Sequence, residues 1–113
     1  MNVKMSGSDG SERMKALMSS IRQTPPTEIA GERVTTVRDY LGGTITDVES
    51  GKVEQTGLPS SNVLYFTTES CVLVIRPSGT EPKVKLYFMA RGGSSEEAKA
   101  RIEAIKVTAQ SLL

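Results

Sequence analysis

Residues 76–85 gather anion-binding side chains into one short segment, whose sequence is RPSGTEPKVK. A phosphate dianion is held best by several donors that converge on one small volume, above all by a guanidinium that contacts two oxygens at once. Arg76 supplies the guanidinium, and Ser78 and Thr80 supply hydroxyls on either side of Gly79. Because Gly79 has no side chain, backbone N–H groups there can approach an anion. These residue types in this order predict a phosphate-binding loop.

The other residues of the segment can support such a loop. Lys85 stands near the start of the next predicted strand and can add a second positive charge. Pro77 and Pro82 restrict the chain on both sides, so less conformational entropy is lost when the loop closes on a ligand. The same Gly and Pro residues would equally serve a hairpin turn that only reverses the chain, and composition leaves both interpretations open. A P-loop is excluded, because the G-x-x-x-x-G-K-[ST] pattern is missing and a strand follows.

No residue of the chain stands out as a catalytic nucleophile or as a metal ligand. Cys71 is the single cysteine, it lies in the apolar run 71–75, and the sequence contains no histidine that could activate it. Free cysteine is among the most often buried residue types, so we expect a buried, reduced thiol. We therefore predict no catalytic residue and no metal site in this chain.

Charge and length limit the classes of protein that this chain can belong to. Fourteen basic and thirteen acidic residues leave a net charge of +1, which argues against nucleic-acid binding and against attraction to a membrane surface. No apolar run approaches the roughly 18 residues of a membrane helix, and we expect a cytoplasmic protein. The 113 residues suit one domain, predicted over 9–113, with residues 1–8 as a disordered leader.

Two segments have the periodicity of amphipathic helices. The first should begin at an Asp9 or Ser11 cap and end near Gln23, before Pro25 and Pro26. Its apolar stripe consists of Met14, Leu17, Met18 and Ile21. The second begins after a capping box in which Ser94 is the N-cap. The buried stripe of this second helix consists of Ala98, Ile102, Ile105, Ala109 and Leu112.

Four strands are predicted, over residues 33–41, 62–68, 71–76 and 83–90. In the last strand, alternation should place Lys83 and Lys85 on the face opposite that of Val84 and Leu86. Short connections between the last three strands favour antiparallel pairing. The sequence therefore predicts an α+β domain in the order α-β-β-β-β-α, with both helices on one face of a four-stranded, mainly antiparallel sheet. Only 44–48 hints at a short strand within the remaining segment, 42–61.

Segment 76–87 resembles the phosphate-binding loop of the α-D-phosphohexomutase superfamily, of the phosphoglucomutase and phosphomannomutase type. Two further stretches are similar to its bacterial phosphoglucomutase branch, namely LPSSNVL at 58–64 and RDYL at 38–41. The resemblance covers most of residues 9–113 and only the last of the family's four domains. It implies an isomerase fragment of carbohydrate metabolism that is inactive alone, since the phosphoserine, Mg²⁺ and sugar-reading loops of the other three domains have no counterpart here.

The resemblance also implies roles for individual residues. Arg76, Ser78, Gly79 and Thr80 would contact the phosphate of a hexose phosphate that is not being transferred, with Lys85 as a further partner. Glu81 would order the loop or meet a sugar hydroxyl. The expected partners are the hexose phosphate and the other three domains, and Mg²⁺ and a hexose bisphosphate intermediate would belong to the whole enzyme. A freestanding phosphosugar-binding module without catalysis is the alternative, which the residues do not distinguish from the first hypothesis.

Overall fold

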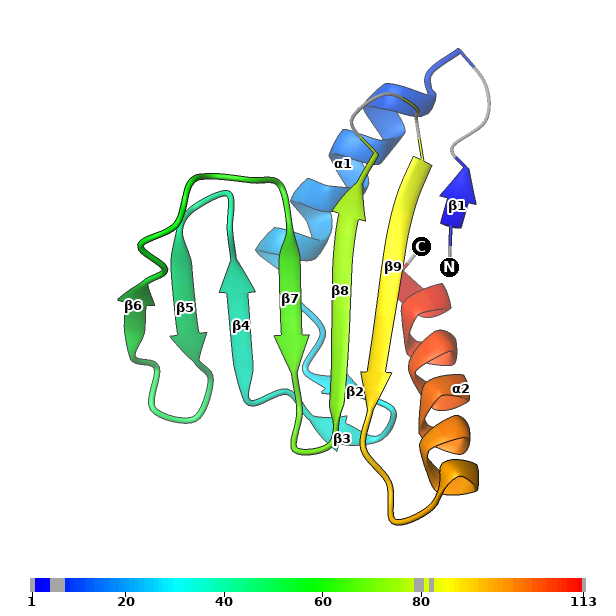
Figure 1. Ribbon diagram of the computed structural model, residues 1–113. Coiled ribbons are helices and arrows are strands. Elements are labelled where there is room, and N and C mark those ends of the chain that lie inside the picture. The colour runs from blue at the N-terminus through cyan, green and yellow to red at the C-terminus, as the bar shows by residue number, and fades with distance from the viewer. Residues whose placement is uncertain (1, 5–7, 79–80, 82, 113) are drawn as a thin grey trace.

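The computed structural model describes residues 2–4, 8–78, 81 and 83–112. These residues form two helices and nine strands (Figure 1). The helices are α1 (Gly10–Gln23) and α2 (Ser95–Leu112). The strands are β1 (Asn2–Lys4), β2 (Glu28–Ile29), β3 (Glu32–Arg33), β4 (Thr36–Asp39), β5 (Thr44–Asp47), β6 (Val53–Gln55), β7 (Leu64–Thr67), β8 (Cys71–Pro77) and β9 (Lys83–Ala90).

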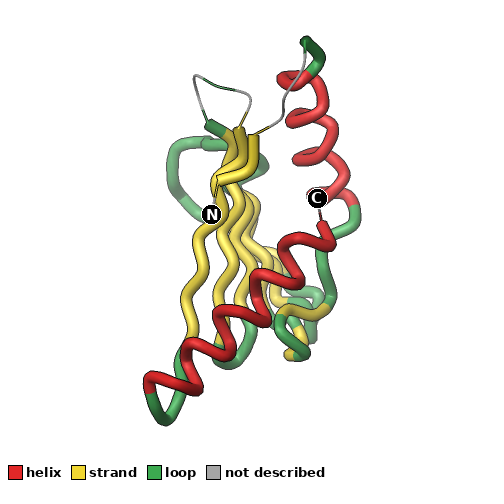
Figure 2. Tube along the Cα trace, turned by 90° about the vertical axis from the view of Figure 1, so that its right-hand side faces the viewer, coloured by secondary structure: helices red, strands yellow, loops and turns green. Residues whose placement is uncertain are grey.

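Seven of these strands form one sheet in the order β1-β9-β8-β7-β4-β5-β6, in which all neighbours are antiparallel. β2 and β3 form a separate two-stranded hairpin. Figure 2 shows both helices on the same side of the large sheet. The predicted α+β class, antiparallel pairing and one-sided helices are thus confirmed, whereas the prediction of a four-stranded sheet is wrong.

The additional strands lie at the edges of the sheet, where the sequence carries little apolar alternation. β5 and β6 form a hairpin within segment 42–61, and all three residues of β6 are exposed. Its turn depends on Asp47, whose side chain accepts hydrogen bonds from the N–H groups of Glu49 and Ser50, and on Gly51, which has a φ of 73°. Segment 33–41 contributes only the four residues of β4 to the sheet.

The N-terminal residues form the other edge of the sheet. β1 pairs with β9, with Val3 opposite Val84, and Val3 packs against the core. We expected residues 1–8 to be a disordered leader; Asn2–Lys4 form this strand, and residues 1 and 5–7 lie outside the described part of the chain.

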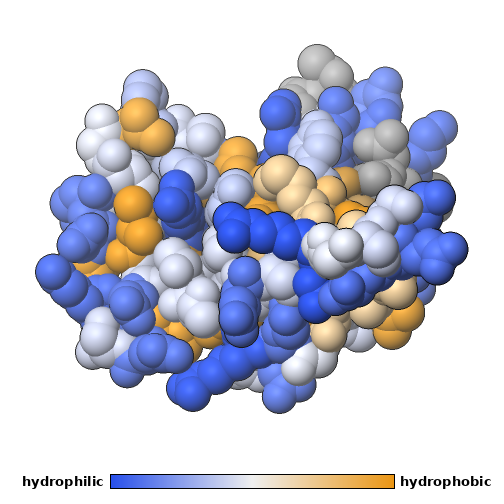
Figure 3. All heavy atoms as spheres, turned by 60° about the horizontal axis from the view of Figure 1, so that its bottom comes forward, coloured by the Kyte–Doolittle hydropathy of each residue, from blue (hydrophilic) through white to orange (hydrophobic). Residues whose placement is uncertain are grey.

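One hydrophobic core fills the space between the helices and the sheet. It follows the predicted alternation, because inward positions of β7, β8 and β9 are buried. Of the predicted helix stripes, Met14, Met18, Ile21, Ile105 and Ala109 are buried, while Leu17, Ile102 and Leu112 are partly buried and pack against the core. Its buried members are Met14, Met18, Ile21, Ile29, Val34, Leu64, Phe66, Cys71, Leu73, Ile75, Val84, Leu86, Ile105 and Ala109. Exposed apolar side chains such as Val53 and Val107 are scattered, and Figure 3 shows a mostly hydrophilic surface at the end of the sheet nearest the start of α2.

The helix ends agree with the sequence prediction. In the capping box of α2, Glu97 N–H donates to Ser94 Oγ over 3.2 Å, and Gly93 N–H donates to Glu97 Oε2 over 3.0 Å. α1 ends at Gln23, just before the two prolines, and its N-cap residue is Asp9, which makes no side-chain capping hydrogen bond. In the chain, α1 thus precedes and α2 follows the strands that carry the predicted loop.

Candidate functional site

The predicted phosphate-binding segment forms the connection between the two longest strands, β8 and β9. Because Ile75 and Leu86 are buried against the helices, the alternation of both strands places Arg76 and Lys85 on the opposite face of the sheet. The register of β8 and β9 sets Arg76 directly across from Lys85. Two of the predicted site residues are thus neighbours at the end of the sheet where the hairpin begins.

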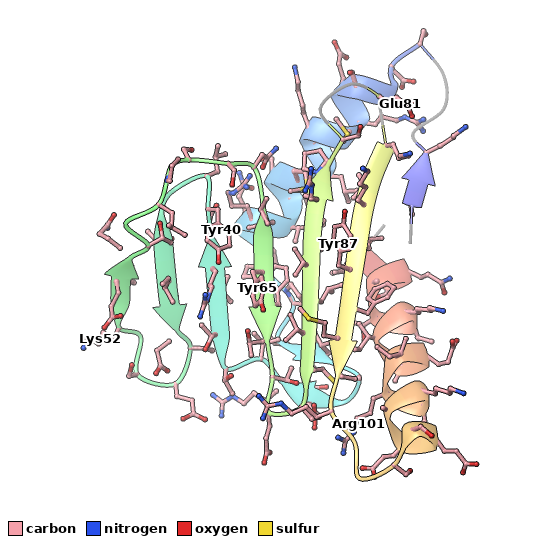
Figure 4. All side chains as sticks on the ribbon, in the orientation of Figure 1. Tyr40, Lys52, Tyr65, Glu81, Tyr87 and Arg101 are labelled. Atoms are coloured by element: carbon pink, nitrogen blue, oxygen red, sulfur yellow. The ribbon has the colours of Figure 1, made fainter. Side chains whose placement is uncertain are left out.

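We call the face of the sheet that is turned away from the helices the open face. Two more lysines lie at its hairpin end, and together with Arg76 and Lys85 they form what we call the cationic corner. Lys83 shares the face of Lys85, and the β1–β9 register sets Lys4 across from Lys83. Farther from the hairpin the face becomes aromatic, since Tyr65 and Tyr87 flank the same residue of β8 in the strand register. Figure 4 shows both tyrosines on the face turned away from the helices, and Glu81 in the hairpin loop. Four cationic residues thus gather at the hairpin end of this face, while the guanidinium of Arg38 lies over the ring of Tyr65, 5.4 Å from its centre.

The described part of the hairpin loop is held by backbone hydrogen bonds. Ser78 N–H donates to the carbonyl of Lys83 over 2.7 Å, and Lys83 N–H donates to the carbonyl of Glu81 over 2.8 Å. The Lys83 ammonium lies 3.7 Å from a carboxylate oxygen of Glu81. Pro77 is the last residue of β8. Gly79, Thr80 and Pro82, also predicted for this loop, lie outside the described residues.

A hollow of about 380 Å³ opens beside the loop. Its lining residues are Ser61, Asn62, Val63, Arg76, Pro77 and Ser78. The three from segment 61–63 were not predicted as site residues, although they belong to the stretch 58–64 whose resemblance to the family was recognised in the sequence. The sequence motif at 58–64 could have indicated these residues. That they lie near the loop follows only from the pairing of β7 with β8.

Asn62 is tied to α1 by its side chain. Arg22 Nη2 donates to Asn62 Oδ1 over 2.8 Å, and Arg22 Nε donates to Asp39 Oδ2 over 3.0 Å. The second carboxylate oxygen of Asp39 accepts from the backbone N–H groups of Leu41 and Gly42. These contacts join the last turn of α1, the end of β4 and the segment before β7.

Cys71 lies in the core, away from the cationic corner. It is a free, buried thiol, as predicted, and burial raises its pKa. The thiol therefore remains protonated near neutral pH and is poorly suited to nucleophilic attack.

Neither a metal centre nor a membrane span is found in the described part of the chain. No three acidic or cysteine side chains converge there to hold a metal ion, so the described residues do not fit the Mg²⁺ that the resemblance implies for the whole enzyme. Of the two described helices, neither is long and apolar enough to cross a membrane.

Known proteins are similar in sequence to this chain over most of its length. The sequence model of a family described as phosphoglucomutase/phosphomannomutase, C-terminal domain, matches residues 1–107. The chain belongs to this family. The match begins at the segment that forms β1, includes the β8–β9 hairpin and extends into α2.

Two bacterial phosphoglucomutases are similar to this chain over one part of their own length. The phosphoglucomutase of Staphylococcus aureus (strain bovine RF122 / ET3-1) is 32% identical over 101 residues, which are 89% of this chain. That of Staphylococcus saprophyticus subsp. saprophyticus is 35% identical over 98 residues, or 87% of this chain. The matched part makes up 18% of each relative. The resemblance recognised in the sequence is thus confirmed.

Proposed function

We propose that this domain binds the phosphate of a hexose phosphate at the β8–β9 hairpin, with Arg76, Ser78 and Lys85 among its ligands. The observation that carries the proposal is the pairing of Arg76 with Lys85 across neighbouring strands. Like charges directly opposite each other destabilise a sheet. Among the described residues neither side chain has an ion-pair partner. A bound dianion would turn this repulsion into two charge-assisted contacts.

Each residue of the proposed site would make the contact that its side chain allows. The Arg76 guanidinium would contact two phosphate oxygens at once, while the ammonium of Lys85 acts as a single positive charge. Ser78 and Thr80 would add hydroxyls, and backbone N–H groups around Gly79 would add further donors, as predicted from the sequence. Glu81, which lies against Lys83, would keep that side chain in place. The hollow beside the loop leaves room for the sugar.

Within a phosphoglucomutase, this grip would serve to orient the substrate. We propose that the domain holds the phosphate that is not being transferred, while the chemistry occurs elsewhere in the protein. Binding energy from a remote group then places the reacting hydroxyl correctly, which lowers the barrier without any catalytic residue here. A hexose bisphosphate intermediate that turns around would present each of its phosphates to the same site.

Titration of isotope-labelled protein with glucose 6-phosphate tests the proposal by nuclear magnetic resonance. We expect the backbone amides of Ser78, Gly79 and Thr80 to shift first, with an affinity on the order of 1 mM, about 4 kcal/mol, because most of the sugar remains in water. Added salt should weaken binding, since the site is open to solvent.

Substitutions of Arg76 decide whether the loop is the site. Arg76→Ala should abolish the shifts, and Arg76→Lys should weaken them because an ammonium cannot replace the two-pronged contact. Arg33→Ala removes an exposed guanidinium from β3, distant from the hairpin, and should leave binding unchanged (Figure 1). Shifts that scatter over α1 and α2, or that persist in Arg76→Ala, would mean that the hairpin only reverses the chain.

A further inference from the structure

We infer that Asn62 is a further ligand-binding residue of this site, and that Arg22 and Asp39 position its side-chain amide. The inference rests on the proposed function, because it adds one donor to the same phosphosugar site. It starts from the hollow beside the hairpin, which Asn62 lines together with Arg76 and Ser78.

The orientation of the Asn62 amide follows from the chemistry of its partner. A guanidinium has only donors, so the group that lies 2.8 Å from Arg22 Nη2 must be the amide oxygen. The amide NH₂ is consequently turned away from Arg22. No hydrogen-bond partner of this NH₂ is found among the described residues. Asn62 lines the hollow, so its two N–H donors are left for an oxygen acceptor bound there.

Arg22 is itself held in a fixed position. Its Nε donates to Asp39, and only 23% of its side chain and 19% of that of Asp39 are exposed. Asp39 is anchored in turn by the N–H groups of Leu41 and Gly42. Because the guanidinium polarises the amide oxygen, it makes the NH₂ a stronger donor. Contacts that run from the β4–β5 turn through Arg22 of α1 thus hold the side-chain amide of Asn62 in one orientation at the hollow.

The acceptor that suits this NH₂ is an oxygen of the bound hexose phosphate, either on the phosphate or on the sugar ring. A purely structural role would use the same three side chains only to clamp α1 to the sheet. The two roles differ in one observable respect. A ligand-binding amide must respond to the ligand, whereas a clamp must not.

The side-chain NH₂ resonances of the unmodified protein give the most direct test. The sequence contains two asparagines and three glutamines, so the Asn62 signal can be assigned with few alternatives. We expect the Asn62 NH₂ to shift in step with the Ser78 backbone amide during titration with glucose 6-phosphate. A shift with inorganic phosphate as well would place the acceptor oxygen on the phosphate. A shift with the sugar phosphate alone would place it on the sugar.

The variant Asn62→Asp distinguishes an effect on ligand binding from an effect on stability. The carboxylate keeps an acceptor for Arg22 but loses both N–H donors, so we expect an unchanged or higher melting temperature and about tenfold weaker binding of glucose 6-phosphate. Ser61→Asp is the control for charge, since it introduces a carboxylate at the neighbouring lining residue and leaves the amide intact. It should weaken binding less, and added salt should remove most of its effect.

The outcomes distinguish the inference from the proposed function. If no amide of the hairpin responds to glucose 6-phosphate, both are overturned. If Ser78 responds while the Asn62 NH₂ does not, the phosphate site stands and the inference is wrong. Equal losses in Asn62→Asp and Ser61→Asp, both removed by salt, would likewise reduce Asn62 to a structural contact.

Discussion

The carboxylate of Glu32 accepts the hydroxyl of Ser70, with 2.7 Å between Oε2 and Oγ, and so joins two hairpins that are distant in sequence. Thr68 donates to the same carboxylate over 2.8 Å. The first hairpin is β2–β3, and the second is the turn between β7 and β8. These hydrogen bonds lower the pKa of Glu32, because they favour its charged form. The contact anchors the small hairpin to the end of the sheet that lies opposite the β8–β9 loop.

We predict that Glu32→Gln lowers the free energy of unfolding at pH 7 by about 1 kcal/mol, because a neutral amide accepts these hydrogen bonds less strongly. The folded pKa of Glu32 is lower than its ordinary value, because hydrogen bonds from Ser70 and Thr68 favour the charged form. The contribution of Glu32 to stability is therefore complete above that value and is lost as the pH falls through the folded pKa. Chemical denaturation between neutral and acidic pH should show the two proteins converging in acid.

Glu28→Gln is the matched control for that measurement. Glu28 lies on the paired strand β2, is exposed and has no side-chain hydrogen bond in the described part of the chain. Its substitution should change the unfolding free energy by less than about 0.5 kcal/mol. An acid-dependent difference as large as that of Glu32→Gln would contradict the assignment to Glu32.

Two residues of α2 test how that helix packs. Ile105 is fully buried in the core, whereas Val107, two positions later, is 67% exposed. We predict that Ile105→Ala costs about 2–5 kcal/mol in unfolding free energy, since it leaves a cavity, while Val107→Ala costs less than about 0.5 kcal/mol. Thermal unfolding followed by circular dichroism measures both. Comparable losses would mean that α2 presents a different face to the sheet.

We also predict that the purified chain does not convert glucose 1-phosphate to glucose 6-phosphate. It corresponds to 18% of the phosphoglucomutases that it resembles, and no metal-binding cluster is present among its described residues. Phosphoryl transfer would thus lack both a phosphate carrier and a metal ion to stabilise the transferred group. A coupled assay on protein from a host without phosphoglucomutase gives the answer. Turnover that survives Arg76→Ala would indicate a contaminant, while turnover that Arg76→Ala abolishes would refute the prediction.

The sequence by itself was sufficient for the elements whose signals are local. Alternation along β9 assigned Lys85 to the open face, because successive side chains of a strand point to opposite sides. Helical spacing identified the face of α2 that packs on the sheet, where Ile105 and Ala109 are buried and Ile102 and Leu112 partly buried, and Ser94 with Glu97 identified the start of the helix. The composition of segment 76–85 predicted the candidate phosphate loop, and the resemblance of the chain to the family is confirmed by comparison.

The tertiary structure alone decided which elements are neighbours. β4 pairs with β7 and leaves the β5–β6 hairpin at the edge, while β1 adds itself to β9. Edge strands are short and exposed, so they carry little of the apolar alternation by which a strand is recognised. Arg22 and Asn62 meet although 40 residues separate them. Periodicity states which face a residue occupies, whereas strand pairing is chosen by the packing of the whole core, and only that packing brings Asn62 beside Arg76.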